Sequence, residues 1–178
     1  MAESPVPCSE KRTVESLIFE YPHWEALTSN TLLAFHHLNE QKFIRRFYLA
    51  GGTGLALHLG HRLSIDLDFF SENPTAVDQN ERSEIQHSLE DPTLIITDDK
   101  EGTFLASWKE VGISFFRLDQ YPVVTPLLAL ESIQVASVME IGAMKLAAII
   151  GRGTRKALLT FTLSCKRYLS RIFSKQPL

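Results

Sequence analysis

The feature that most constrains this chain is a pair of glycines set between an apolar stretch and an acidic one. Residues 47–50 are apolar and predict a strand, and Gly51 and Gly52 follow at once. Residues 53–60 predict a short helix, and residues 64–70 alternate polar and apolar side chains as a strand does. Strand, glycine turn, helix and acidic strand would form one continuous unit of a mixed α/β fold.

Two aspartates give the acidic strand its chemistry. Asp66 and Asp68 would share one face, because alternate side chains of a strand point to the same side, while Leu67 points into the core. Carboxylate oxygens are the ligands that Mg²⁺ prefers, and two ions about 3.5–4 Å apart can stabilise the attacking and leaving oxygens of a phosphoryl transfer. The pair therefore predicts a metal site.

The glycine turn predicts a phosphate site beside these carboxylates. Gly51 and Gly52 have no side chain, so backbone N–H groups can approach an anion closely. The hydroxyl of Thr53 and the positive N-terminal end of the helix would face the same phosphates. Either motif alone also occurs in ordinary turns or calcium loops, but the two in this order indicate a nucleotide site. A sugar-nucleotide transferase could also hold metal with Asp-x-Asp, but the upstream glycine turn argues against it.

Residues 48–70 resemble the nucleotidyltransferase toxins of the AbiEii/AbiGii family, a branch of the DNA polymerase beta-like nucleotidyltransferase superfamily. The resemblance resumes at residues 144–149 and 152–156, and roughly residues 30–156 fit the family pattern. It implies a polymerase-beta-like core, an α/β (α+β) fold with a mixed sheet and flanking helices. It also implies a nucleoside triphosphate substrate, Mg²⁺ or Mn²⁺, an RNA acceptor such as the tRNA 3′ end, and a cognate antitoxin protein as partner.

The resemblance also assigns roles to single residues. In the family, the glycine turn and the paired aspartates bind triphosphate and metal, and a lysine of a later helix contacts phosphate. We accordingly expect Asp66, Asp68 and Lys145 to be catalytic, the two aspartates to bind metal, and Gly51, Gly52, Thr53, Ser64, Arg62 and Arg152 to bind nucleotide. Arg152 would lie two helical turns after Lys145 on the same face. A lysine among apolar residues can also simply extend to solvent, which leaves a second interpretation of Lys145 open.

A third carboxylate is harder to find. Many polymerase-like nucleotidyltransferases carry one on a neighbouring strand, but here the inward polar position of the candidate strand is Ser114. Either the two aspartates suffice, or another acid comes from Glu140 or from beyond Lys156.

The other elements follow from hydrophobic periodicity and turn residues. We expect a helix near 30–42 capped at Ser29 or Asn30, a helix near 81–89, and a helix at 137–150 capped by Ser137. Expected strands are 93–97, 103–108 and 111–117, in an antiparallel meander, and an edge strand at 133–136.

The end of the chain departs from the family. After Lys156 the family pattern continues with Asp-Phe, two residues and Asp-Leu, whereas this chain reads Ala157-Leu158-Leu159. Loss of one base from suitable codons for the family sequence produces this reading, so we expect 157–178 to be a frameshift-derived tail. The C-terminal helical region would then be mostly missing, and the chain could be a truncated, inactive pseudoenzyme that at most binds nucleotide.

Composition and charge fit this division. The 178 residues, 44% of them hydrophobic, suit one globular domain. We expect a flexible tail at 1–12, the nucleotidyltransferase core at 13–136 and the start of the helical region at 137–156. Every acidic residue lies at or before Glu140, and the basic remainder could be an RNA-binding surface or, as we prefer, a result of the frameshift. No membrane span or secretory signal is apparent, so the cytoplasm is the expected compartment.

Overall fold

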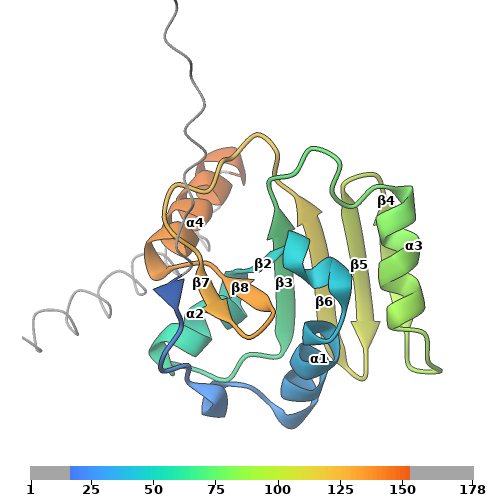
Figure 1. Cartoon of the computed structure of the whole chain (residues 1–178), viewed down its shortest axis with the longest axis horizontal. Helices are drawn as coiled ribbons and strands as arrows, with labels where there is room; N and C mark the ends of the chain where they lie inside the picture. Colours follow the sequence, from blue (N-terminus) through green and yellow to red (C-terminus); the bar gives the residue numbers. More distant parts are fainter. Residues whose placement is uncertain (1–16, 153–178) are drawn as a thin grey trace, which may run out of the picture.

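The computed structural model describes residues 17–152, and its strands form one mixed sheet flanked by helices (Figure 1). Within these residues the sheet has eight strands in the order β1-β7-β8-β2-β3-β6-β5-β4. The strands are β1 (Leu17–Ile18), β2 (Tyr48–Leu49), β3 (Asp66–Ser71), β4 (Ile95–Lys100), β5 (Thr103–Trp108), β6 (Val111–Arg117), β7 (Leu128–Leu130) and β8 (Ile133–Val135). The expected α/β class with a mixed sheet is confirmed.

Parallel and antiparallel pairs are mixed through the centre of the sheet. β2 and β3 are antiparallel, β3 and β6 are parallel, and β6, β5 and β4 form the expected antiparallel meander. The predicted strands 103–108 and 111–117 coincide with β5 and β6. The strand expected at 93–97 is β4, which begins at Ile95 and runs on through Asp98 and Asp99. A register shift after Ile96 lets both aspartates pair with β5.

The helices are α1 (Ser29–Asn39), α2 (Gly51–Leu59), α3 (Gln79–Ser88) and α4 (Val138–Arg152), with short 3-10 helices η1 (Trp24–Ala26) and η2 (Lys42–Arg46). The expected cap of α1 is wrong by one residue, because the Thr28 hydroxyl accepts the backbone N–H of Thr31 at 3.2 Å. The expected cap of α4 is confirmed, since the Ser137 hydroxyl accepts the N–H of Glu140 at 3.1 Å.

One face of the sheet packs on the main core. Rings from β3, β6 and the segment before β2 meet there, with Phe69 stacked on Phe115 at 5.1 Å between centroids and Phe47 edge-on to Phe115 at 5.0 Å. Helices α1, η2 and α3 contribute Phe35, Phe43 and Ile85 to the same cluster. On the other side, α2 and α4 pack around Tyr48 and Ala50 and form a smaller cluster with Leu55, Leu59, Ala136 and Ile141.

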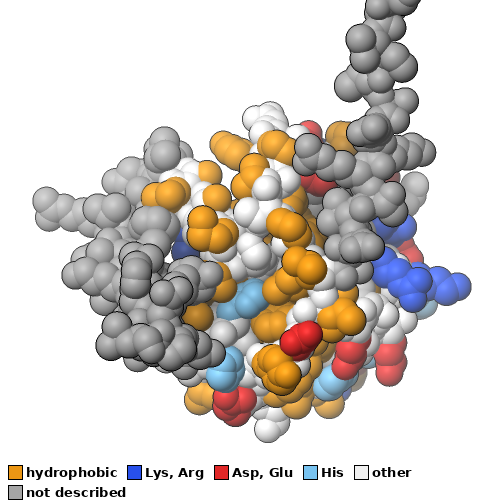
Figure 2. Space-filling view, turned by 60° about the vertical axis from the view of Figure 1, so that its left-hand side comes forward, with side chains coloured by type: hydrophobic (Ala, Val, Ile, Leu, Met, Phe, Trp, Pro, Cys, Tyr) orange, Lys and Arg blue, Asp and Glu red, His pale blue; other side chains and the backbone are white. Residues whose placement is uncertain are grey.

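The predicted edge strand at 133–136 is wrong in its position. β8 lies inside the sheet, between β7 and β2, because β7 pairs with it and β1 pairs with β7 in turn. The true outer strand on this side is β1, whose Leu17 and Ile18 are exposed. The face of the molecule that Figure 2 turns forward carries many apolar side chains.

Several expectations concern residues outside the described range. The tail at 1–12 and the frameshift-derived segment at 157–178 lie there, as do the last residues of the predicted helical region. Among residues 17–152, no helix combines the length and the apolar character that crossing a bilayer requires.

Candidate active site

Gly51 begins α2 directly against the carboxylate of Asp68 on β3. The φ angle of Gly51 is 63°, in the left-handed region that favours glycine, and a methyl group on its Cα would collide with the Asp68 side chain. The backbone N–H of Ala50 donates to the Asp68 carbonyl oxygen at 3.0 Å, which fixes the two segments together. The helix therefore begins two residues earlier than expected, and its first turn lies beside a carboxylate.

Asp66 and Asp68 lie on one face of β3, as their spacing predicts, with Leu67 fully buried on the opposite face. In the register with β6, Asp66 lies opposite Gly112 and Asp68 opposite Ser114. A side chain at Gly112 would overlap an oxygen of the Asp66 carboxylate, so this glycine leaves room for the aspartate. Both carboxylates thus reach one region of the sheet.

Burial and charge disfavour ionisation of Asp68. Burial raises the pKa of this carboxyl first, and the negative charge of Asp66 raises it further. A hydrogen bond from Ser114 and the charge of Lys145 lower it in part. Asp66 is exposed and Asp68 is half-buried. A cation stabilises two neighbouring carboxylates that repel each other, and their hard oxygen donors suit Mg²⁺ or Mn²⁺.

Two cationic side chains, Lys145 and Arg62, also lie near the glycine turn and Asp68. The pKa of Lys145, on α4, is lowered by burial and then by the charge of Arg62, while Asp68 acts in the opposite direction. The guanidinium of Arg62 lies so close to Gly52 that a methyl group there would collide with it. The fold therefore brings Lys145, Arg62, the glycine turn and Asp68 together from distant parts of the chain.

Thr53 and Ser64 lie next to the site, but their hydroxyls are buried and paired. The two hydroxyl oxygens are 2.8 Å apart, and the Thr53 hydroxyl also donates to the carbonyl oxygen of Asp66. The Ser64 carbonyl oxygen accepts the Thr31 hydroxyl at 3.3 Å. In this arrangement the pair fixes α2 against the start of β3. Arg152 is the last residue of α4, and its side chain lies outside those described.

The sequence left open whether Glu140 supplies a third carboxylate in place of Ser114. Glu140 is buried and accepts the backbone N–H groups of Val124 and Thr125 at 3.0 and 2.9 Å, so its carboxylate fixes the segment before β7. Ser114 donates to Asp68 instead of adding a negative charge. In the part of the chain that the structure describes, no third His, Cys, Asp or Glu completes a metal-binding group with the pair.

Gly112 is the residue of this site that sequence reasoning missed. Its signal was present, because a glycine inside a strand pattern often marks the close approach of another group. Its importance became clear only from the parallel pairing of β3 with β6.

One family of known proteins matches the sequence of this chain. The sequence model described as nucleotidyl transferase AbiEii toxin, type IV TA system, matches residues 33–158, more than half of the chain. None of the curated protein sequences compared with the chain matches it.

Solved structures share the fold at low sequence identity. The solution structure of the antibiotic-resistance factor ANT(2″)-Ia has a TM-score of 0.50 and 14% identity, over 78% of this chain and 85% of that one. The crystal structure of ANT(2″)-Ia with adenylyl-2″-tobramycin has a TM-score of 0.51 and 15% identity, over 78% and 89%. A putative nucleotidyltransferase from H. pylori has a TM-score of 0.41 and 18% identity, over 67% and 59%.

Proposed function

The chain belongs to the AbiEii family of nucleotidyltransferase toxins, which act in type IV toxin–antitoxin systems, and from this we propose that it transfers a nucleotide from a nucleoside triphosphate to RNA. The proposed acceptor is the 3′ end of a tRNA, and the reaction depends on Mg²⁺ or Mn²⁺. The observation that carries the proposal is the contact of the glycine turn at Gly51 with Asp68, one of two adjacent carboxylates.

Each group of the site has a role in this reaction. Asp66 and Asp68 would hold the metal ion, which when bound offsets negative charge on the phosphates. The first N–H groups of a helix have no partner inside it, so those near Gly51 and Gly52 are suited to donate hydrogen bonds to phosphate oxygens. Lys145 and Arg62 would bind the outer phosphates, with Arg152 as a further cation. Thr53 and Ser64 support the turn from beneath.

The reaction that this arrangement supports is an in-line displacement. The acceptor hydroxyl attacks the α-phosphorus, and a new O–P bond forms while the bond to the bridging oxygen of the β-phosphate breaks. Pyrophosphate leaves with the electron pair, and the acceptor proton passes to solvent. Positive charge from Lys145 and Arg62 would stabilise the leaving pyrophosphate.

The proposed partner and compartment follow from the family. A type IV toxin–antitoxin family supports a separate cognate antitoxin protein as partner. RNA and triphosphate occur together in the cytoplasm, and we propose that the protein acts there.

The test is transfer of labelled nucleotide to purified tRNA, with Mg²⁺ and with a chelator. The wild-type chain should label tRNA only with the metal, and Asp66→Asn with Asp68→Asn should abolish labelling. A double variant that labels tRNA as fast as wild type would contradict the assignment of these carboxylates.

A second candidate is a nucleotide-binding protein with little or no transfer activity. It is favoured by Ser114 at the position of a third carboxylate, together with the engagement of Glu140 by the segment before β7. The DNA sequence across the codons of Lys156 and Ala157 tests the underlying frameshift. Adding one base after the Lys156 codon should restore Asp-Phe-Ile-Asp-Leu and raise transfer to RNA. Equal transfer by the present and repaired chains, or an immediate stop in the repaired frame, would contradict it.

A further inference from the structure

Three aromatic rings form a row across the centre of the sheet, next to the two carboxylates. Tyr48 of β2 lies opposite Phe70 of β3, and Phe70 lies opposite Phe116 of β6. The ring centroids of Tyr48 and Phe70 are 6.0 Å apart, and Phe70 and Phe116 are stacked at 5.4 Å with an interplanar angle of 24°. The row thus crosses three strands without a break.

The first ring of this row is buried and the other two are half-buried. Tyr48 is buried at 4% exposure, and Phe70 is half-buried against the cluster formed by α2 and α4. Phe116, the last ring, is half-buried, and its next neighbour across the sheet is Thr103 of β5. The row therefore begins in the interior and ends at a ring with part of its surface open.

Phe116 and the carboxylates lie on the same face of the sheet. Phe70 follows Asp68 by two residues, and Phe116 follows Ser114 by two, so each ring lies about 7 Å along its strand from the site. Leu105 of β5 lies opposite Ser114 and adds another half-buried apolar side chain to this face. An apolar surface therefore adjoins the proposed phosphate site.

Packing alone does not account for the open ring. Cross-strand ring pairs usually stabilise sheets by packing, and on the opposite face of the same strands Phe69 and Phe115 do so with no exposure. Phe116 points away from the main core, to which Phe69 and Phe115 belong, and it is only half-buried. An aromatic face left partly open beside a phosphate site is suited to a planar ligand.

We propose that Phe116 is a stacking platform for a nucleobase that lies beside the proposed metal and phosphate site of Asp66 and Asp68. The inference rests on the proposed function and adds the part of the nucleotide that its site leaves unassigned. Stacking on an aromatic ring tolerates any base, because every base has a π-face, so the platform fixes the position of the nucleotide without selecting its identity. The base belongs to the triphosphate or to the RNA acceptor, and binding measurements distinguish the two.

The experiment compares ligands with and without a base. Affinities for Mg²⁺–ATP, Mg²⁺–tripolyphosphate and a short single-stranded RNA are measured for wild type, Phe116→Leu and Phe116→Tyr. Leucine keeps an apolar side chain of moderate size but removes the ring, and tyrosine keeps the ring. Tyr21→Leu is the matched control, because it removes a ring that is 83% exposed in the segment before η1.

Phe116→Leu should weaken ATP binding between about fivefold and a hundredfold, leave tripolyphosphate binding unchanged, and be rescued by Phe116→Tyr. The same pattern with RNA in place of ATP supports the platform and assigns the base to the acceptor. Unchanged binding of both ATP and RNA overturns the inference, as does an equal loss for ATP and tripolyphosphate. If wild type binds no Mg²⁺–tripolyphosphate at all, the proposed function fails, and this inference with it.

Discussion

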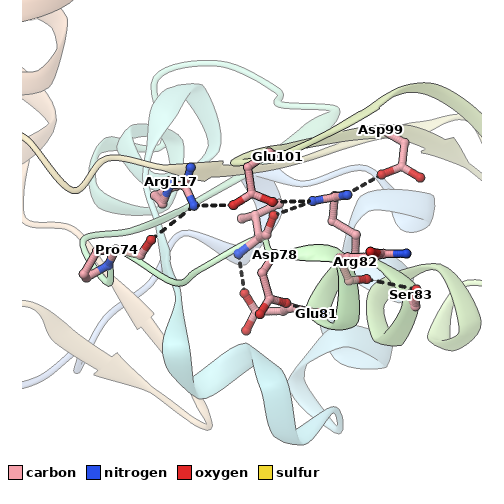
Figure 3. A network of polar contacts seen from close by, with 10 residues as sticks. Pro74, Asp78, Glu81, Arg82, Ser83, Asp99, Glu101 and Arg117 are labelled. Carbon is pink, nitrogen blue, oxygen red and sulfur yellow. Dashed lines mark hydrogen bonds and ion pairs between the residues drawn. The ribbon is translucent and has the colours of Figure 1, made fainter.

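Around the start of α3, charged side chains alternate in sign and pair, whereas around the start of α2 charges of the same sign lie together. Arg82 contacts Asp99 at 2.5 Å and Glu101 at 3.3 Å, and Glu101 accepts Arg117 at 2.6 Å (Figure 3). Arg117 also donates to the carbonyl oxygen of Pro74, which attaches the loop before α3 to β6. In this network each arginine is paired with at least one carboxylate, so the positive and negative charges neutralise one another.

In the candidate active site, by contrast, side chains of the same charge lie close together. Burial is the first cause that raises the pKa of Asp68 and lowers that of Lys145, and a neighbour of like charge, Asp66 or Arg62, adds to each shift. The attraction between Asp68 and Lys145 offsets part of both shifts. In the network, by contrast, Arg117 lowers the pKa of Glu101. Such repulsion costs folding free energy, and a fold retains it where a ligand of opposite charge relieves it. The comparison supports the proposal that the network stabilises the fold and that the like-charged groups of the candidate site bind a ligand.

The largest effect should come from Gly51→Ala. The left-handed backbone and the collision with Asp68 should together cost about 2–4 kcal/mol of unfolding free energy, measured by urea denaturation, and remove triphosphate binding. Gly60→Ala is the control, since Gly60 is also left-handed but abuts the ring of His23. It should be destabilised yet still bind. Equal loss of binding in both variants would mean that destabilisation, not the site, explains Gly51.

Lys145→Ala should have the next largest effect, on ligand selectivity. A cation at the outer phosphates favours triphosphate over monophosphate, and its loss should reduce that preference about tenfold in a binding titration. Stability should change little, because the neighbouring Arg62 is also positive. Lys100→Ala, which removes an exposed lysine paired with Asp98, is the control and should keep the preference. Unchanged selectivity in the Lys145 variant would support the solvent-directed interpretation of this lysine.

The smallest effects should appear in the pH dependence of metal-free stability. The folded pKa of Asp68 is raised above its ordinary 3.8, so the stability it contributes is present below that value and lost as pH rises through the folded pKa. Asp68→Asn should therefore stabilise the metal-free protein at pH 7.

Glu101 should behave in the opposite way. Its folded pKa is lowered from 4.5, so its contribution is present above that value and lost as pH falls through the folded pKa. Glu101→Gln should slightly destabilise the protein at pH 7. At acidic pH, where Glu101 is protonated, the stability of the variant should differ little from that of wild type. Thermal unfolding from pH 3 to 8 measures the stability of Asp68→Asn and Glu101→Gln. If both variants were stabilised, or both destabilised, at pH 7, the proposed difference between site and network would be wrong.

Sequence periodicity predicted the parts of the fold that are long and regular. β5 and β6 were predicted to the residue, because six or seven alternating positions define a strand. β1 and β7 were missed, and without them β8 was placed at the edge. The shared face of Asp66 and Asp68 also followed from alternation alone.

The rest of the site depends on contacts between distant segments. The sequence placed Thr53 and Ser64 near the phosphates but could not show that their hydroxyls pair with each other beneath the turn. The closeness of Lys145 to Arg62, and of Gly112 to Asp66, arises only when α4 and β6 pack beside β3. Pattern rules describe neighbours along the chain, and these neighbours are set by topology.

The central claim, that the like-charged groups of the candidate site bind a ligand, is tested most directly by calorimetric titration of Mg²⁺–ATP. Wild type is compared with the site variant Asp66→Asn, Asp68→Asn and with the network variant Asp99→Asn, Glu101→Gln. Loss of the two proposed metal ligands should weaken the Mg²⁺-dependent binding by more than about a hundredfold, because even residues that merely support metal ligands contribute ten- to a hundredfold. The network variant should bind like wild type. Equal affinity of the site variant and wild type would contradict the account.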